Sequence, residues 1–300
     1  MEKSITKKII NSGLVFALAL SLSSCTKTSA PPEPTNPPIS FNLGEFAKVD
    51  GSTVTIPLTT ALTEAALGIP DASNLIKHNT TSQAIVNLIK GDADIIFVTY
   101  PSDAELQSAQ KAGVELEIVP VVNDAFVFLV NSSNPITGLT TQQIKDIYSG
   151  KTTNWKTVGG DNVDIIAYQR EVGSGSQSGM VRFMGTAKLA LAPKEFTEGE
   201  MGGLVEKLAA FSSGKSAIGY SYYYYVNSMY VKDGIKLLAV DGIEPNNQTI
   251  SAGEYPNITP YYIAINKNAE PNSFARRFME YALTDRGQRV AENAGYVKVK

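Results

Sequence analysis

The sequence is poor in the residue types on which most catalytic and metal sites depend. Its 300 residues include 1 Cys and 1 His. A single Cys excludes an intrachain disulfide and a zinc site built from several thiolates. A single His, His78, excludes a site with several histidine ligands and leaves one candidate base for a histidine-dependent triad. These shortages narrow the routes to metal and nucleophilic catalysis, and we expect no metal and no cofactor.

The sequence also lacks an excess of positive charge. It has 26 Lys and Arg against 29 Asp and Glu, a formal net charge of -3. A nucleic-acid-binding protein normally presents a basic surface, so we expect no nucleic-acid partner. An anionic ligand would have to be held by local donors instead of by the overall field. The hydrophobic fraction of 43% is ordinary for a globular protein, and the length favours two domains.

Residues 1–24 have the pattern of a secretory signal. A lysine-rich start precedes the apolar run 9–22, which is shorter than the roughly 20 residues of a comfortable membrane span. The motif Leu22-Ser23-Ser24-Cys25 resembles a bacterial lipobox, in which the cysteine becomes the lipidated first residue. The alternative is a free Cys25 beside an ordinary cleavage site. We predict a lipoprotein signal peptide and a protein anchored by lipid to the outer face of the cell membrane.

The segment that follows is predicted to be a disordered tether over residues 25–45. Residues 26–38 contain five prolines, several Ser and Thr, and no aromatic residue. Such a composition cannot bury a core and is typical of an extended linker.

From residue 46 onward, short apolar runs alternate with helical patterns, which is typical of an α/β fold with buried strands. Pro57 suits the first turn of a helix, and Gly91 and Gly113 suit helix ends. The predicted helices cover 58–67, 84–90, 103–112, 140–148, 174–184, 204–211 and two segments within 272–293. The predicted strands cover 94–98, 116–122, 125–130, 163–168, 217–220, 235–240 and 258–265.

Three hydroxyl-rich segments each lead into a predicted helix and are candidate oxyanion sites. They are Asp50-Gly51-Ser52-Thr53-Val54, Asn79-Thr80-Thr81-Ser82 and Arg170-Glu171-Val172-Gly173-Ser174-Gly175-Ser176. The first turn of a helix leaves backbone N–H groups unpaired at the positive end of the helix dipole. Glycine lets that backbone approach a ligand, and hydroxyls add donors. Arg170 adds a planar fork that matches two oxygens of an anion.

Each of these features has a purely structural alternative. Ser and Thr at helix starts usually act as N-caps, and Thr80 with Gln83 also fits a capping box. Ser174 lies between glycines, as in a nucleophile elbow, but only His78 could serve as its base. His78 itself is interpreted as a surface or hinge residue. The tyrosines at 222–225 either pack together or line a sugar site.

Further motifs extend the third segment in both directions along the chain. They are Gly138-Leu139-Thr140-Thr141, Tyr148-Ser149-Gly150-Lys151, Asn154-Trp155-Lys156-Thr157-Val158-Gly159-Gly160 and Tyr168-Gln169-Arg170. With these motifs, residues 46–300 resemble the phosphate-binding proteins of phosphate ABC importers, most specifically over 136–184. The resemblance implies an α/β periplasmic-binding-protein fold of type II, with a ligand cleft between two lobes joined by two crossing strands. It implies lobe I at 46–122 and 243–300 and lobe II at 123–242.

The resemblance also implies which residues hold the anion, with donors from both lobes. Such proteins commonly carry an Asp where this sequence has Thr99, and its carboxylate accepts the proton of hydrogen phosphate. A Thr hydroxyl does not repel a fully ionised anion, so the choice between phosphate and sulfate stays open. The implied binding residues are Ser52, Thr53, Val54 through its backbone N–H, Thr81, Thr99, Arg170, Ser174, Gly175 and Ser176.

The sequence therefore predicts an extracytoplasmic solute-binding protein, lipid-anchored at Cys25, that is not an enzyme. It would capture inorganic phosphate for an ABC importer, with the permease subunits as partners. The alternatives are a binder of another oxyanion such as sulfate or molybdate, a sensory binding protein without transport, a binder of organic solutes, and a phosphatase or serine hydrolase acting at Ser174.

Overall fold

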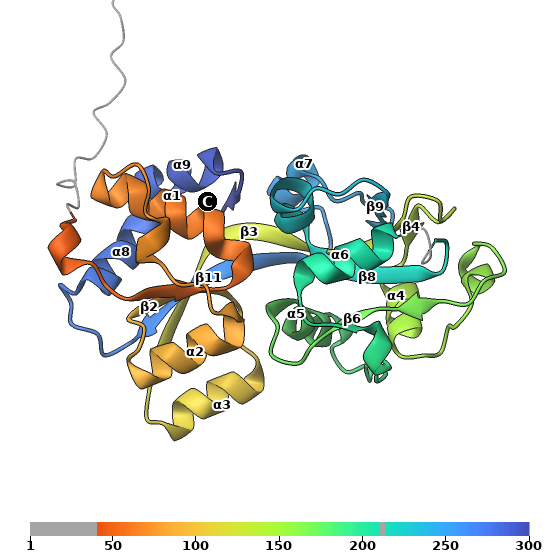
Figure 1. Cartoon of the computed structure of the whole chain (residues 1–300), viewed down its shortest axis with the longest axis horizontal. Helices are drawn as coiled ribbons and strands as arrows, with labels where there is room; N and C mark the ends of the chain where they lie inside the picture. The colour runs from red at the N-terminus through yellow and green to blue at the C-terminus, as the bar shows by residue number, and fades with distance from the viewer. Residues whose placement is uncertain (1–40, 211–213, 300) are drawn as a thin grey trace, which may run out of the picture. The chain divides into compact units, whose positions relative to one another are not determined.

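The computed structural model describes residues 41–210 and 214–299, which belong to a single unit of the chain, Ile39–Lys300 (Figure 1). The predicted signal peptide, Cys25 and the tether up to residue 40 lie outside the described residues. Within residues 41–210 and 214–299, no helix combines the length and the apolar character needed to cross a membrane.

The predicted tether is wrong at its C-terminal end, over residues 41–45. The ring of Phe41 packs on Phe274 and Tyr281, with centroids 5.0 and 5.5 Å away. A short 3-10 helix, η1 (Leu43–Glu45), follows, and Glu45 pairs with Arg277 at 2.8 Å. The ring contacts of Phe41 and the ion pair of Glu45 hold this segment on the folded unit.

A mixed β-sheet forms the framework. Its strand order is β1 (Val49–Gly51), β2 (Ile95–Thr99), β11 (Ile258–Asn266), β3 (Leu116–Asn131), β8 (Ala217–Tyr222) and β5 (Ile166–Ala167). The outer pairs β1–β2 and β8–β5 are parallel, and the pairs between them are antiparallel. β9 (Ile235–Leu237) and β12 (Val297–Lys298) also pair with β3. Small two-stranded ladders join β4 (Gly138–Leu139) with β10 (Ala239–Val240) and β6 (Gln169–Arg170) with β7 (Thr197–Glu198).

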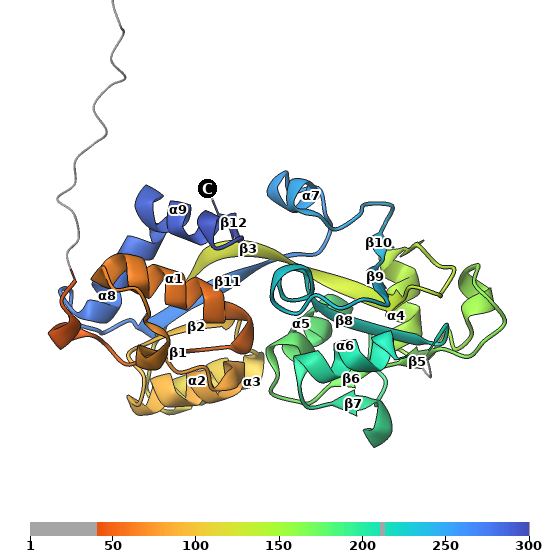
Figure 2. The same ribbon diagram turned by 45° about the horizontal axis from the view of Figure 1, so that its top comes forward.

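The strand β3 is continuous, where the sequence predicted two strands separated at 123–124. It pairs with β11 over residues 116–125 and with β8 over residues 126–130, and so runs through both halves of the sheet (Figure 2). Asp124 is tolerated inside the strand because its carboxylate accepts hydrogen bonds from the backbone N–H of Ala125 and Tyr224, at 2.7 and 3.0 Å, and from the Tyr261 hydroxyl. A polar residue that breaks the hydrophobic pattern therefore does not break the strand.

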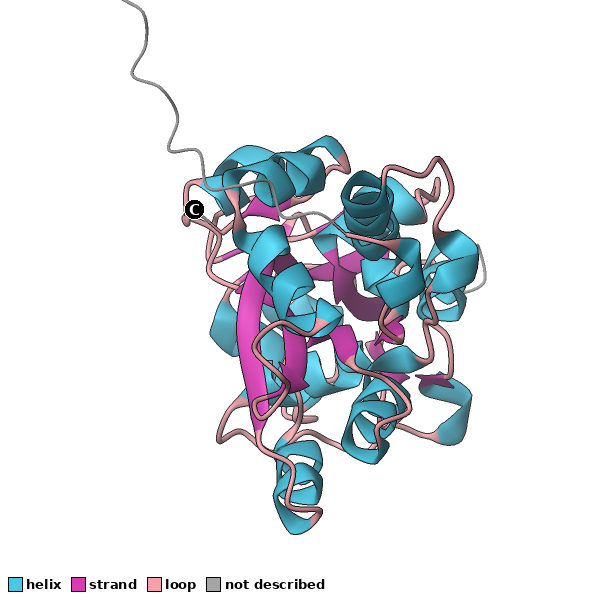
Figure 3. Ribbon diagram, turned by 90° about the vertical axis from the view of Figure 1, so that its left-hand side faces the viewer, coloured by secondary structure: helices cyan, strands magenta, loops and turns pink. Residues whose placement is uncertain are grey.

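In the half of the sheet that contains β2, helices cover both faces (Figures 1 and 3). Ile95 and Phe97 of β2 join the main core, while Ile96 and Val98 join a second core beneath α2. This alternation is the two-residue period of a strand that is buried on both faces. One face carries α1 (Ile56–Leu67), α8 (Phe274–Leu283) and α9 (Asp285–Asn293), and the other carries α2 (Thr80–Lys90) and α3 (Asp103–Lys111).

In the other half, α5 (Gly175–Met184) and α6 (Met201–Ala209) pack on β8. A Cβ added at Gly219 of β8 would lie 2.6 Å from a methyl group of Leu204, so the missing side chain lets α6 lie close to the strand. The remaining elements are α4 (Thr141–Tyr148), α7 (Asn247–Ser251), the 3-10 helices η2 (Thr53–Thr55), η3 (Ser73–Leu75), η4 (Trp155–Val158) and η5 (Lys194–Phe196), and the π-helix η6 (Tyr225–Met229).

Several predicted helix boundaries are confirmed. Pro57 lies in the first turn of α1, and Gly91 ends α2 with a φ of 76°. The predicted helix 84–90 begins earlier, at Thr80 of α2. The capping-box alternative for Thr80 and Gln83 is wrong, because Asn79 is the N-cap residue and makes no side-chain cap bond. The side-chain amide of Asn79 donates to the Asp50 carboxylate instead, at 2.9 Å.

Two strand predictions are wrong in extent. Only Ile166–Ala167 of the predicted strand 163–168 forms a strand, β5, while Asp164 makes an isolated bridge with Asn154. The predicted strand 235–240 divides into β9 and β10, which pair with different partners. The α/β class itself is confirmed.

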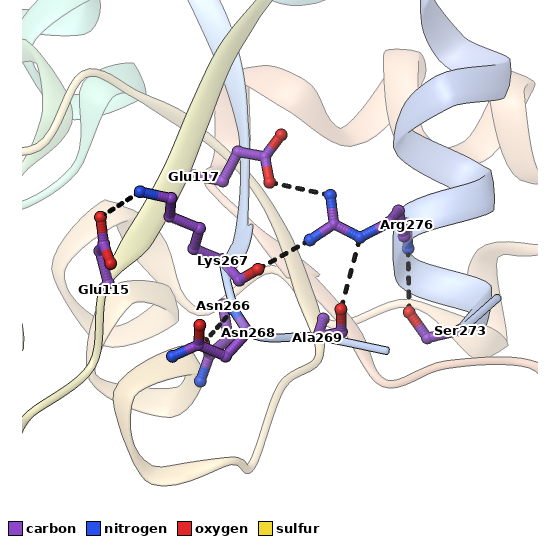
Figure 4. Close-up of polar contacts among 8 residues, drawn as sticks. All are labelled: Glu115, Glu117, Asn266, Lys267, Asn268, Ala269, Ser273 and Arg276. Carbon is purple, nitrogen blue, oxygen red and sulfur yellow. Dashed lines mark hydrogen bonds and ion pairs between the residues drawn. The ribbon is translucent and has the colours of Figure 1, made fainter. Parts of the chain in front are cut away.

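A polar cluster joins the start of β3, the end of β11 and the start of α8 (Figure 4). Arg276 donates to Glu117 and to the carbonyl of Lys267, each at 2.9 Å, and the ammonium of Lys267 pairs with Glu115. Such exposed ion pairs contribute at most about 1 kcal/mol each. The bonds from Arg276 fix α8 against the end of the sheet.

Candidate functional site

One cavity of about 660 Å³ brings together all the predicted binding residues. They come from the turn after β1, the start of α2, the end of β2, and the segment that joins β6 to α5. We call this part of the cavity its inner half. It consists of Ser52, Thr53, Val54, Thr80, Thr81, Thr99, Arg170, Ser174, Gly175 and Ser176.

The turn after β1 is built tightly against β2. The backbone N–H of Ser52 donates to the carbonyl of Phe97 at 2.9 Å. A Cβ at Gly51 would lie only 2.7 Å from the same oxygen, so glycine is required for this approach. The Ser52 hydroxyl is buried in the cavity wall and has no hydrogen-bond partner among the described residues. An unsatisfied buried hydroxyl costs free energy, so it indicates a place that a ligand would fill.

Two threonine hydroxyls meet at the centre of the inner half. Thr81 of α2 and Thr99 of β2 are buried, and their Oγ1 atoms lie 3.3 Å apart. Beside them Thr80, which also lines the cavity, has a φ of 70°. This left-handed conformation is unfavourable for a β-branched residue, and strained backbone of this kind occurs preferentially at functional sites.

The start of α5 faces these threonines. Ser174 is its N-cap residue and accepts a hydrogen bond from the backbone N–H of Gln177 at 3.2 Å. A Cβ at Gly175 would lie 2.6 Å from the Thr99 hydroxyl and 2.7 Å from the Thr81 hydroxyl. Glycine therefore lets the first turn of α5, with its unpaired N–H groups, close over the two hydroxyls.

Arg170 supplies the positive charge of the inner half. Its side chain donates from Nε to the carbonyl of Glu198 at 2.9 Å, from Nη2 to the carbonyl of Gly199 at 2.8 Å, and from Nη1 to the Ser176 hydroxyl at 3.3 Å. The residue is 6% exposed. None of the ion pairs formed between described residues involves it.

Burial lowers the pKa of the Arg170 guanidinium, although the negative charges of Glu171 and Glu198 oppose the shift. The group remains protonated because an arginine is not deprotonated in proteins. A buried cation without a paired carboxylate is costly, so the inner half favours a bound anion.

The position of Arg170 is fixed by its own backbone. Its N–H donates to Oε1 of Gln177 at 3.1 Å and to the Tyr220 hydroxyl at 2.9 Å. Gln177 belongs to α5 and Tyr220 to β8, so the strand, the helix and the guanidinium are held together as one unit.

The rest of the cavity wall consists of Tyr222 and of a part that we call the outer half: Gly199, Glu200, Met201, Gly202, Gly203, Glu206, Tyr225 and Tyr230. Sequence reasoning missed this wall except for the tyrosines at 222–225, for which a sugar site was one alternative. The sequence predicted a helix beginning at Leu204, whereas α6 begins at Met201 and directs its first turn to the cavity. The pair Gly202-Gly203 just before the predicted helix was a signal that could have indicated this segment.

The tyrosines at 222–225 are buried, as the packing alternative predicted, and two of them also line the cavity. Tyr222 donates to the carbonyl of Gly175 at 3.0 Å and so supports the first turn of α5. The rings of Tyr225 and Tyr230 are parallel, with an interplanar angle of 6° and centroids 5.8 Å apart.

His78 does not line the cavity. Its Nε2 atom lies 2.8 Å from Oγ1 of Thr59 in α1, and burial lowers its pKa, opposed by the charge of Asp50. Residues 41–210 and 214–299 contain no cluster of three His, Cys, Asp or Glu side chains that could hold a metal.

Comparison with known proteins gives consistent findings. Residues 27–286 match a family model described as a PBP superfamily domain. The phosphate-binding protein PstS of Bacillus subtilis (strain 168) is 25% identical over 256 residues, covering 84% of this chain and 80% of that protein. The phosphate-binding protein PstS of Staphylococcus aureus (strain USA300) is 29% identical over 259 residues, covering 84% and 77%.

Solved structures show the same likeness. A Clostridium perfringens protein, described as a phosphate ABC transporter substrate-binding protein and solved with bound phosphate, has a TM-score of 0.67 and 26% identity, covering 85% of this chain and 99% of that one. An ABC-type phosphate transport receptor from Vibrio cholerae has a TM-score of 0.64 and 22% identity, covering 84% and 99%. These likenesses confirm the predicted fold class, an α/β fold of two lobes.

Proposed function

The chain belongs to the PBP superfamily, and from this premise we propose that it captures inorganic phosphate, or a closely similar tetrahedral oxyanion, for an ABC importer. The relatives named above carry phosphate binding in their descriptions. The proposal assigns the anion to the inner half of the cavity.

The observation that carries this proposal is the buried Arg170 guanidinium among uncharged donors. It lies without a paired carboxylate in a wall of hydroxyls and helix-start N–H groups. A tetrahedral anion would neutralise the buried cation and would also accept a hydrogen bond from the unpartnered Ser52 hydroxyl. We assign ligand roles to Ser52, Thr53, the Val54 N–H, Thr81, Thr99, Arg170, Ser174, Gly175 and Ser176.

The donors reach the cavity from both proposed lobes. We assign lobe I to 46–122 and 243–300, and lobe II to 123–242. Direct contacts join the two proposed lobes outside the cavity: Ser82 donates to the carbonyl of Gly173 at 2.8 Å, and Arg182 donates to the carbonyl of Tyr100 at 3.1 Å. An anion that contacts both lobes would favour closure over opening, because only differential contacts shift such an equilibrium.

The proposed role includes no chemical step on the ligand. Ser174 accepts a hydrogen bond as an N-cap residue, and no histidine is among the residues that line the cavity. A phosphatase or hydrolase at Ser174 would need a base that His78, bonded to Thr59, does not supply there. Turnover of a phosphate ester that disappears in Ser174→Ala would contradict this part of the proposal.

The proposed location is the outer face of the cell membrane, with a lipid on Cys25 and ABC permease subunits as partners. This rests on the motif Leu22-Ser23-Ser24-Cys25, which lies outside the described residues. Metabolic labelling with a fatty acid should mark the wild-type chain and leave Cys25→Ala unlabelled.

Calorimetric titration with inorganic phosphate tests the central proposal. Arg170→Ala should weaken phosphate binding at least tenfold, since a charge-assisted bond to a buried anion contributes about 1.5–3 kcal/mol. Arg289→Ala is the matched control, because Arg289 is exposed and does not line this cavity. Unchanged affinity in a folded Arg170→Ala protein would contradict the assignment.

Titrations with sulfate, arsenate and molybdate at two pH values define the selectivity. Thr99 stands where a carboxylate would reject an anion that carries no proton. Sulfate binding as tight as phosphate binding would identify the ligand class as tetrahedral oxyanions in general, which is the alternative reading of this site.

A further inference from the structure

The cavity is considerably larger than the anion proposed for it. A phosphate ion has five non-hydrogen atoms, and at roughly 30 Å³ each, the share of a water molecule in the liquid, it takes up about 150 Å³. The cavity measures about 660 Å³ and continues past Arg170 into the outer half. Volumes of this size are typical of pockets for organic ligands.

The outer half has a chemistry of its own. Tyr225 is 7% exposed and lines the cavity, and no hydrogen bond between described residues involves its hydroxyl. The parallel ring of Tyr230 lies beside it, and a Cβ at Gly202 would be 3.4 Å from both tyrosines. A stacked pair of tyrosine rings next to the first turn of α6 suits the C–H groups of a polyol, and the Tyr225 hydroxyl suits its hydroxyl groups.

Two carboxylates restrict what the outer half accepts. Glu200 and Glu206 both line it, and Glu206 accepts hydrogen bonds from the Tyr230 hydroxyl at 2.6 Å and from Lys232 at 2.9 Å. Carboxylates accept hydrogen bonds from hydroxyls but repel a second anionic group. The part of the ligand that occupies the outer half is therefore neutral and rich in hydroxyls.

The inner half favours an anion that carries no proton to donate. None of its residues is an Asp or a Glu, so it presents hydroxyls, N–H groups and a guanidinium. Hydrogen phosphate carries a P–OH proton that a carboxylate would accept. A phosphate monoester presents its unesterified oxygens to the donors, and its ester oxygen continues into carbon.

We propose that the cavity binds the phosphate monoester of a small neutral polyol or sugar, with the phosphate at Arg170 and the organic part against Tyr225 and Tyr230. This inference rests on the proposed oxyanion site and extends it to a class of ligand. The ester oxygen of such a ligand would lie between the inner half and the outer half of the cavity.

Calorimetric titration of the full chain tests the inference with four probes: inorganic phosphate, glycerol phosphate, glucose phosphate, and glycerol alone. We expect at least one of the esters to bind as tightly as inorganic phosphate or more tightly, and glycerol not to bind. Weaker binding of both esters than of inorganic phosphate overturns the inference and leaves the proposed function intact. Binding of no phosphate compound overturns both.

Variants of the outer half provide a second, independent readout. Tyr225→Phe should weaken ester binding about fivefold, the effect of one lost hydrogen bond, and change phosphate affinity less than about twofold. Tyr223→Phe is the matched control, because Tyr223 belongs to the same run but does not line the cavity. Gly202→Leu fills the outer half and should reduce ester binding selectively. Equal losses for ester and phosphate in Tyr225→Phe would contradict the inference.

Discussion

The cavity around Arg170 and the strand crossing around Asp124 each bury an ionisable side chain, and they satisfy it differently. Asp124 lies where β3 runs beside β11 and accepts hydrogen bonds from two backbone N–H groups and the Tyr261 hydroxyl. Arg170 donates to two carbonyls and a hydroxyl and has no paired carboxylate among the described residues.

The comparison distinguishes a buried charge with a structural role from a buried charge that could bind a ligand. Around Asp124 three neutral donors satisfy the carboxylate, and Asp124 does not line the cavity. Arg170 also has only neutral hydrogen-bond partners, but it lines the cavity, where the Ser52 hydroxyl has no partner among the described residues. Unused hydrogen-bonding capacity around a buried charge therefore distinguishes the candidate site from a structural buried charge.

The largest expected effect is the contribution of Asp124, in β3, to the pH dependence of the free energy of unfolding. Burial raises the pKa of Asp124 from 3.8 to about 7, although its hydrogen bonds to Tyr261, Ala125 and Tyr224 act in the opposite direction. Between these two values the folded state holds a proton that the unfolded state has released. Stability from this group is therefore complete below about pH 4 and declines as the pH rises to about 7, by about 4 kcal/mol at most.

Urea unfolding across this pH range, compared between wild type and Asp124→Asn, isolates the contribution of Asp124. The comparison is needed because His78, whose pKa burial lowers, changes stability in the opposite direction. The wild type should lose stability relative to Asp124→Asn as the pH rises from 4 to 7. If the difference in unfolding free energy between wild type and Asp124→Asn stays constant with pH, the pKa of Asp124 is not raised by burial and the assignment is wrong.

The next effect concerns the closest approach in the cavity. Gly175→Ala places a methyl group 2.6 Å from the Thr99 hydroxyl and 2.7 Å from the Thr81 hydroxyl, so α5 must move away. We expect phosphate affinity to fall at least about thirtyfold, or about 2 kcal/mol, because displacement separates the donors of the two lobes. Calorimetry measures the loss. Gly44→Ala, where the added methyl group would meet only ordinary contact at 3.6 Å, should bind as the wild type does.

The smallest expected effect compares two unpartnered buried hydroxyls. Ser52 lines the cavity, whereas Ser221 of β8 does not. Ser52→Ala should lower phosphate affinity about fivefold, or about 1 kcal/mol, without lowering stability, because no protein hydrogen bond is lost. Ser221→Ala should leave the affinity unchanged. Equal affinities of the two variants would mean that the unused capacity at Ser52 does not serve the ligand.

Local sequence signals predicted the inner half because its chemistry is local. A hydroxyl or a glycine at a helix start creates an anion-binding geometry within a few residues, and Arg170 to Ser176 form one such segment. The same locality explains why the start of α1 at Pro57 and the end of α2 at Gly91 were predicted correctly. The residues that define the start or end of a helix are neighbours in the sequence.

The outer half and the strand crossing depend on contacts that no local pattern contains. The rings of Tyr225 and Tyr230 are parallel because the π-helix η6 separates the two residues along the chain. Gly202 of α6, which is distant in sequence, lies next to both rings. Asp124 interrupts an apolar run, so its burial within one continuous strand follows only from Tyr224 and Tyr261, which are distant in sequence.

The sequence alone determined the α/β class and the residue types proposed to hold an oxyanion, because periodicity and helix-start chemistry act over a few neighbouring residues. Tertiary structure decided that these turns face one cavity, that Arg170 is buried without a paired carboxylate, and that the cavity continues beyond it. The physical reason is that burial and the pairing of charges are properties of residues brought together from distant parts of the chain.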